Sequence, residues 1–171
     1  MRFLRKLLGR EEVPADVAGR LAPDEHVVAM ARVGEASRLV VTSRGLWLPG
    51  DEGARLVGWH LVSKATWGGG VLTVVEAEEA ETIGKAVLLT DLPPRRMRLA
   101  EPGRVPETVH TRVEASIRSR HHRDLPGGGA WFVQRKVPGR DGIVLQVRPD
   151  PGTDVALVRR LVADVEHTLG H

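Results

Sequence analysis

The feature that most constrains the fold is a series of short apolar runs between about His26 and Ala100, with turn residues between them and no long helical pattern. Several of the runs alternate apolar and polar side chains, as a strand with one buried face does. Strands at roughly 8–12-residue spacing are typical of antiparallel barrels and sandwiches. The sequence therefore predicts seven antiparallel strands, over residues 26–33, 38–42, 45–49, 54–62, 67–79, 85–93 and 96–102.

The second and third runs are predicted to form a hairpin. They flank Ser43, Arg44 and Gly45. Gly45 is placed to supply a positive φ, which a tight turn between two strands requires.

Helical patterns flank the strands. A short helix is expected over residues 15–21, and a longer one from Pro106 to about Arg120 or His122. The longer helix carries a narrow apolar stripe four residues apart, formed by Val109, Val113 and Ile117. We expect this stripe to lie on the barrel.

The C-terminal part is predicted to be a small extension. Residues 126–129 form the best linker, residues 130–137 and 142–149 are two strand candidates, and a helix follows from Thr153 or Asp154 to Leu169, with Thr153 as a candidate cap. Two strands and one helix are too small for a core of their own. The extension must therefore dock on the barrel or on a second copy of the chain.

Adjacent aromatic residues in the first of these strands, Trp131 and Phe132, are expected to point to opposite sides. With 171 residues, the chain is long enough for one core with a small appendage. The predicted organisation is an N-terminal helical segment (1–23), a barrel with its capping helix (24–125), and a hairpin–helix extension (126–171). The fold class is α+β and mainly β.

Composition excludes several classes of protein. The chain has no cysteine, which excludes disulfide frameworks, zinc ribbons and thiol nucleophiles and is compatible with a reducing cytoplasm. No apolar stretch reaches the roughly 18 residues that a membrane-spanning helix needs. There is no G-x-S-x-G motif, and neither glycine triplet is followed by the Gly-Lys-Ser/Thr of a phosphate-binding loop. No cofactor and no catalytic residues are therefore predicted.

Positive charge is concentrated in residues 94–148, which carry 12 Lys and Arg against 5 Asp and Glu, whereas the whole chain has a net charge of +3. This stretch is either a solvated face or an anion-binding surface for an acidic protein or a membrane. Nucleic acid is disfavoured because the chain has no Tyr and only two Phe for base stacking. The candidate partner-binding residues are Arg95, Arg96, Arg98, Arg112, Arg118, Arg120 and Arg123.

The first ten residues form a short basic amphipathic segment. Such a segment binds anionic lipid through apolar insertion and cationic attraction, or simply docks on the body of the protein. The membrane-surface candidates are Arg2, Phe3, Arg5, Lys6 and Arg10. The expected location is the cytoplasm, with peripheral association at the inner membrane face as the alternative.

The densest group of metal-ligand residue types is His121, His122 and Asp124, with His110 upstream. These side chains would suit zinc or nickel. Neighbouring residues of a helix point about 100° apart, however, and histidines near a helix C-terminus are favoured by the helix dipole alone. The prediction is therefore that no metal is bound, and a small metal-dependent enzyme remains the alternative.

Residues 39–75, LVVTSRGLWLPGDEGARLVGWHLVSKATWGGGVLTVV, resemble the bacterial branch of the pleckstrin-homology-like (PH-like) family. The residues that match its pattern are Thr42, Arg44, Trp59, Val62 and Leu72. The resemblance extends over about residues 24–122 and implies a seven-stranded barrel capped by a helix, a scaffold commonly used for binding. Lipid headgroup recognition does not carry over, because Arg44 is the lone cation at the first hairpin and Asp51 and Glu52 follow at the next loop.

These observations predict a bacterial interaction module without catalytic activity. It would bind an acidic protein or form a homodimer through residues 130–169. The bacterial origin is inferred from an excess of arginine over lysine, 21 to 4, together with abundant Ala, Val and Gly. A peripheral membrane protein that binds anionic lipid and a small metal-dependent enzyme are the alternatives.

Overall fold

The computed structural model describes residues 13–169. Four antiparallel strands form the first sheet, in the order β1 (Val27–Val33), β2 (Ser37–Thr42), β3 (Gly45–Leu48) and β4 (Arg55–Gly58). Alternate residues of β2 face opposite sides, so Leu39 and Val41 enter the main core while Val40 packs with Val17 of the short helix α2 (Ala15–Ala18). Both faces of this sheet are therefore covered near β2.

The turn between β2 and β3 requires a glycine, as predicted. A Cβ on Gly45 would lie 2.1 Å from the carbonyl oxygen of Val57, on the neighbouring strand β4. The close approach of two backbones therefore excludes any side chain at this position.

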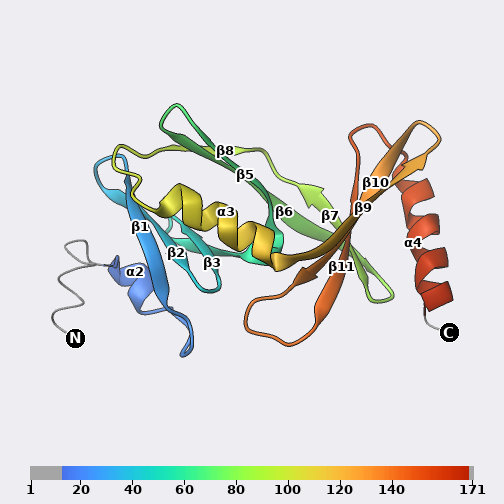
Figure 1. Ribbon diagram of the computed structural model, residues 1–171, viewed down its shortest axis with the longest axis horizontal. Coiled ribbons are helices and arrows are strands. Elements are labelled where there is room, and N and C mark those ends of the chain that lie inside the picture. Colours follow the sequence, from blue (N-terminus) through green and yellow to red (C-terminus); the bar gives the residue numbers. More distant parts are fainter. Residues whose placement is uncertain (1–12, 170–171) are drawn as a thin grey trace.

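The second sheet begins after the 3₁₀ helix η1 (Trp59–Leu61). Its first strands are β5 (Val62–Gly68), β6 (Val71–Ile83), β7 (Ala86–Asp91) and β8 (Arg95–Arg98). The long strand β6 pairs with β5 and β8 along its first half and with β7 along its second half. It therefore links the N-terminal strands to the C-terminal part of the chain (Figure 1).

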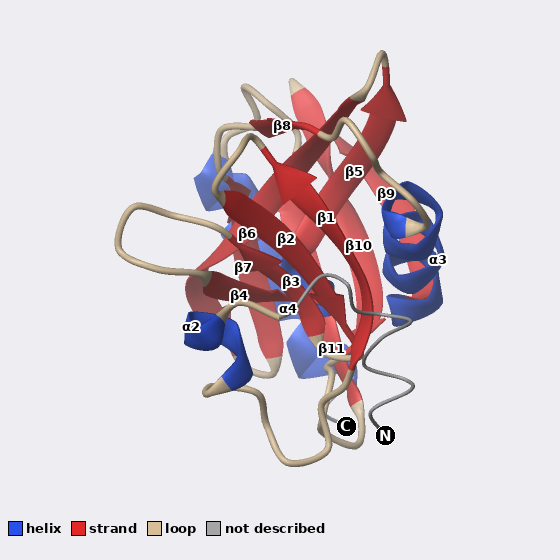
Figure 2. Ribbon diagram, turned by 90° about the vertical axis from the view of Figure 1, so that its left-hand side faces the viewer, coloured by secondary structure: helices blue, strands red, loops and turns tan. Residues whose placement is uncertain are grey.

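Helix α3 (Val105–Ser116) packs against β5, β1 and η1. Figure 2 shows it lying along one side of the two sheets. Its buried residues Val105, Val109 and Val113 join the main core, which confirms the predicted contact for Val109 and Val113. Ile117, the third residue of the predicted stripe, lies just beyond the helix instead. The two sheets and α3 thus form a half-barrel around one apolar core.

The C-terminal part contains β9 (Ile117–Leu125), β10 (Gly128–Lys136), β11 (Ile143–Pro149) and α4 (Val155–Leu169). Strand β11 pairs in parallel with β7 of the same chain, so the second sheet follows the path β5-β6-β7-β11-β10-β9. Helix α4 buries Val158 and Val162 on the outer face of this sheet, against Ala86, Ala130 and Val147. This is a second, smaller core (Figure 1, right).

The structure is mainly β, as predicted, but the strand count and the pairing were wrong. Strand occupies 49% of the residues and helix 21%. Eight strands precede α3, because the predicted run 54–62 ends in η1 and residues 62–68 form a further strand, β5. The sheet is mixed rather than purely antiparallel because β7 and β11 run in the same direction.

The prediction for residues 117–129 was also wrong. The helix ends at Ser116 instead of continuing to Arg120 or His122, because residues 117–125 form β9, whose backbone pairs with β10. Residues 126–129 are not a linker. Pro126 and Gly127 make the turn of the β9–β10 hairpin, where Gly127 has a φ of 80°.

The final helix, α4, occupies the predicted residues, but its cap differs. The N–H of Ala156 donates to the side chain of Asp154 at 2.9 Å. Thr153, the predicted cap, bonds instead through its hydroxyl to the backbone N–H and C=O of Gly129. It therefore fastens the start of α4 to β10.

Candidate binding groove

Three connected cavities follow β5, and we call them together the β5 groove. The first, of about 580 Å³, lies between β5, β7 and β11, and the second, of about 510 Å³, lies between β5, α3 and β10. They share Ser63, Lys64, Leu89, Trp131 and Arg148. A third, of about 480 Å³, continues the groove towards Trp67 and the start of α3. Strand β5 is a terminal strand of the sheet path, and its residues 63–67 line the three cavities.

Cationic side chains outnumber carboxylates in the first two cavities. The cations are Lys64, Arg120, Arg135 and Arg148, and the carboxylates are Asp91, Glu114 and Asp150. Arg120 pairs with Glu114 at 3.3 Å, and Asp150 contacts His122 at 2.7 Å. Lys64 has no ion-pair partner within residues 13–169. The first two cavities therefore have one more cation than carboxylate, and Lys64 is their unpaired cation in the described part of the chain, whereas the third cavity adds the carboxylate of Glu107.

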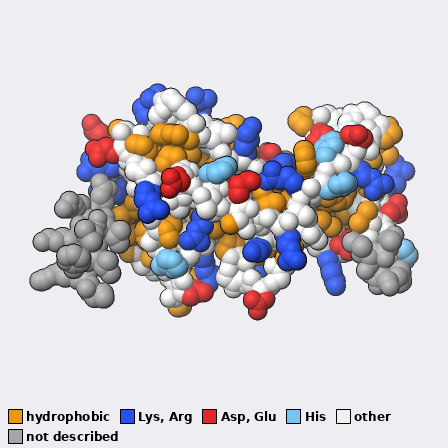
Figure 3. Space-filling view, viewed as in Figure 1, with side chains coloured by type: hydrophobic (Ala, Val, Ile, Leu, Met, Phe, Trp, Pro, Cys, Tyr) orange, Lys and Arg blue, Asp and Glu red, His pale blue; other side chains and the backbone are white. Residues whose placement is uncertain are grey.

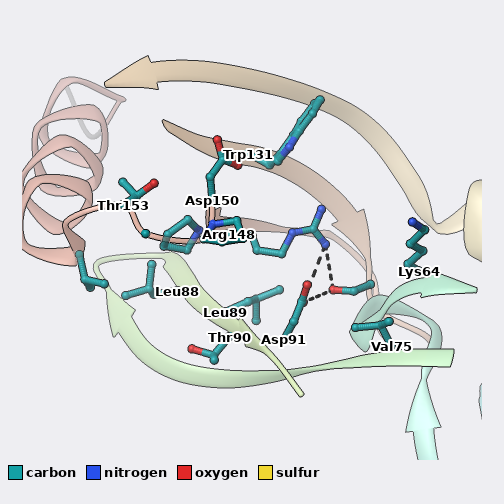
Figure 4. A pocket seen from close by; sticks show the side chains of 15 residues that line it. Lys64, Val75, Leu88, Leu89, Thr90, Asp91, Trp131, Arg148, Asp150 and Thr153 are labelled. Carbon is teal, nitrogen blue, oxygen red and sulfur yellow. Dashed lines mark hydrogen bonds and ion pairs between the residues drawn. The ribbon is translucent and has the colours of Figure 1, made fainter. Parts of the chain in front are cut away.

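Arg148 crosses the first cavity. Its Nη1 donates to the hydroxyl of Ser63 at 2.8 Å and lies 4.0 Å from Asp91 Oδ1. The Ser63 hydroxyl donates in turn to Asp91 at 2.5 Å. Figure 4 shows the guanidinium of Arg148 between Asp91 and the ring of Trp131. These contacts link β11, β5 and β7 across the cavity and hold a cation inside it.

Arg135 connects the C-terminal strands β9 to β11 to the half-barrel. Its side chain is buried, and it donates to the carbonyls of Trp59 and Val62, each at 2.9 Å, and to the hydroxyl of Ser116 at 2.7 Å. Burial, with repulsion from nearby arginines, lowers its pKa to about 10, so it stays charged at neutral pH. One guanidinium thus joins β10 to η1, β5 and the end of α3.

His60 lies at the same junction. Its backbone carbonyl accepts a hydrogen bond of 2.6 Å from Gln146, whereas its buried Nδ1 has no partner within the described residues. Burial, together with the positive charges of Arg135 and Arg140, lowers the pKa of His60 to about 4. The imidazole is therefore neutral at physiological pH.

The seven arginines predicted to bind a partner are spread over β8, α3 and β9. Arg96 and Arg98 are exposed on β8, and Arg118 and Arg123 are exposed on β9. The remaining three differ: Arg95 donates to the carbonyl of Pro49, Arg112 is half-buried on α3, and Arg120 lines the groove. Lys and Arg side chains are accordingly scattered over the face in Figure 3 rather than gathered in one patch.

Sequence reasoning missed three groove cations, Lys64, Arg135 and Arg148. The available signal was the alternation in β10, where Trp131, Val133 and Arg135 share one face, while Phe132 packs beneath α4. This arrangement confirms that Trp131 and Phe132 point to opposite sides.

The predicted metal-ligand residues do not converge. His121 and His122 lie on strand β9, not at a helix C-terminus, and therefore point to opposite sides of the sheet. His122 contacts Asp124 at 3.3 Å and packs edge-on against Trp131, whereas His110 is exposed on α3. Within residues 13–169, no group of three or more candidate ligands is arranged to hold a metal ion.

The membrane-surface candidates Arg2, Phe3, Arg5, Lys6 and Arg10 lie outside the described residues. Among residues 13–169, no helix has both the length and the apolar character required to cross a bilayer. No family model matches the chain, and neither curated proteins nor solved structures give a significant match.

Proposed function

We propose that this chain is a non-catalytic interaction module of the bacterial cytoplasm whose β5 groove binds an acidic segment of a protein partner. The observation that carries this proposal is the set of cations around the groove, Lys64, Arg120 and Arg148. Opposite charge attracts a partner and fixes its register. The order of strands followed by α3 supports a PH-like relationship for the half-barrel, a scaffold suited to binding.

A protein segment suits the groove better than a membrane surface does. Val113, Ile117 and Val133 line it beside the cations, so it offers apolar contact and charge within one concave site. Strand β5 is also a terminal strand of its sheet, the kind of position at which an extended chain can add a further strand through backbone hydrogen bonds. A bilayer presents a broad surface, which would meet the exposed arginines of β8 or β9 rather than a recess.

The test is the binding of a fluorescein-labelled hexaaspartate peptide, measured by fluorescence anisotropy at low salt. Lys64→Glu replaces an attractive charge by a repulsive one, and we expect it to weaken binding about tenfold or more, which corresponds to about 1.4 kcal/mol. Lys136→Glu is the matched control, because Lys136 is also exposed but lies outside the groove. Equal losses in the two variants would show that only net charge matters and would refute the groove as the site.

The second measurement is the binding of the protein to vesicles that contain phosphatidylserine. We expect any vesicle binding to be unchanged by Lys64→Glu, because the groove is not the membrane-facing surface. If vesicle binding depends on Lys64 and the peptide does not bind, the ligand of the groove is anionic lipid rather than an acidic protein segment.

A further inference from the structure

The first cavity of the β5 groove opens where the second sheet splits. Strands β7 and β11 pair through three residue pairs, from Ala86 with Leu145 to Leu88 with Val147. Beyond them β7 continues along β6 and β11 along β10, and the two strands separate. Figure 4 shows them diverging around the cavity. We call this cavity the split pocket.

The walls of the split pocket are largely apolar. They include Val75, Leu88, Leu89, Trp131 and Val155. Val155, the first residue of α4, is 39% exposed, which is unusual for a large apolar side chain in this protein. An apolar surface left open to water in a recess is a place for an apolar group of a ligand.

The same pocket is lined by two cations, Lys64 and Arg148, and by two carboxylates, Asp91 and Asp150. Asp150 contacts His122, and Asp91 contacts Ser63 and Arg148, so Lys64 is the cation that no carboxylate within residues 13–169 pairs. Arg148 and Lys64 line it together with Trp131, and Figure 4 shows all three around one space. The distance of 4.0 Å between Arg148 and Asp91 is longer than a hydrogen bond. An incoming carboxylate can therefore compete with Asp91 for the guanidinium. Apolar walls beside cations favour a ligand that has an apolar side chain next to a negatively charged group.

We propose that the acidic segment carries a bulky aromatic residue next to an acidic one. The aromatic side chain enters the split pocket, against Trp131 and Val155, and the neighbouring carboxylate binds Arg148 and Lys64. This inference rests on the proposed function of the groove and names the sequence class of its partner. A volume of about 580 Å³ leaves room for one such side chain.

Three labelled peptides test this inference. The first is hexaaspartate, the second has one central aspartate replaced by phenylalanine, and the third has the same aspartate replaced by serine. The second and third peptides have equal charge, so their difference reports the aromatic side chain alone. We expect the phenylalanine peptide to bind about tenfold more tightly than the serine peptide, because it buries an aromatic ring.

Val155→Gln should reduce that preference to less than threefold, since it makes one wall of the pocket polar. Ile143→Gln is the control, because Ile143 is 41% exposed on β11 and lies outside the pocket. Equal binding of the phenylalanine and serine peptides, with hexaaspartate still bound, overturns the inference and leaves the groove intact. Failure of all three peptides to bind refutes the proposed function itself. A preference that survives Val155→Gln overturns the placement of the ring in the split pocket.

Discussion

The core beneath α3 contains fifteen buried residues, whereas the core beneath α4 contains six. The smaller core is formed by half of a sheet and one helix, and such a unit has little apolar burial of its own. It is completed by its junction with the barrel, where Arg135, Gln146 and Arg148 donate to groups of η1 and β5. A small apolar cluster of Ala77, Val87 and Leu89, with Leu61 and Val144, also lies at this junction. The comparison indicates that the half-barrel depends mainly on apolar burial, whereas strands β9 to β11 depend on a smaller core together with polar contacts across the junction.

The two regions also differ in how they satisfy a buried polar group. In the barrel, the carboxylate of Glu25 accepts hydrogen bonds from Thr42 at 2.6 Å, Trp47 at 2.8 Å and the backbone of Ala22 at 3.0 Å. Burial alone would raise the pKa of Glu25, but these donors outweigh it and lower the pKa below its usual 4.5. At the junction, Nδ1 of His60 has no partner within residues 13–169.

The largest expected effect follows from removing the guanidinium at the junction. Arg135→Met keeps the aliphatic stem but removes the donors that the guanidinium supplies to the Val62 carbonyl and the Ser116 hydroxyl, while the Trp59 carbonyl keeps only the N–H of Val62. Each unsatisfied group costs about 1–3 kcal/mol, so we expect the free energy of unfolding to fall by about 3 kcal/mol. Urea denaturation measures this change.

The Arg135→Met variant also tests whether the half-barrel and the C-terminal strands lose stability separately. We expect hydrogen exchange to accelerate in β9, β10 and β11 before it does in β2 and β3. Lys136→Met is the control, because Lys136 neighbours Arg135 on β10 but is exposed. Uniform acceleration over both regions would show that they unfold as one unit, against a separate role for the junction.

The apolar pattern explains why much of the barrel was predictable. Alternation located most strands of the first sheet, and the spacing of Val109 and Val113 located α3. Strand β9 was not predictable in this way. Its sequence, IRSRHHRDL, is apolar only at its ends and lies at the exposed edge of the sheet. Pairing with β10, rather than burial of a face, makes it a strand.

The candidate site was less predictable than the fold. Arg118, Arg120 and Arg123 cluster in the sequence and were predicted to bind a partner. Of these three, only Arg120 lines the groove. Lys64 and Arg148 are isolated in the sequence and are brought together by the parallel pairing of β7 with β11. Parallel contacts between distant segments leave no periodic signal in a single sequence.

The second-largest expected effect is a loss of stability in the half-barrel. Glu25→Gln keeps the shape of the side chain but replaces one acceptor oxygen by a donor that faces Thr42 or Trp47. We expect a loss of about 2 kcal/mol in the free energy of unfolding at pH 7. Glu35→Gln, at an exposed position, is the control and should change little. A loss no greater than that of the control would contradict the view that this network stabilises the barrel.

The smallest expected effect is the response of the junction to acid. The pKa of His60 is lowered from 6.5 to about 4 in the folded protein. Above pH 6.5 the imidazole is neutral in both states and does not change the stability. As the pH falls from about 6.5 to about 4, the unfolded chain binds a proton that the folded chain does not, so stability is lost, and below about 4 the loss levels off.

Between pH 7 and pH 5 this loss should be about 1 kcal/mol, allowing for the partial exposure of the ring. His60→Leu should lack this component, since leucine does not titrate, while His26→Leu, at an exposed position, should retain it. Urea denaturation at pH 7, 6 and 5 measures the difference and stays above the range in which Glu25 titrates. If His60→Leu loses as much stability as the original chain over this range, the unpartnered imidazole is not the acid-sensitive point of the junction, and the two regions respond to acid alike.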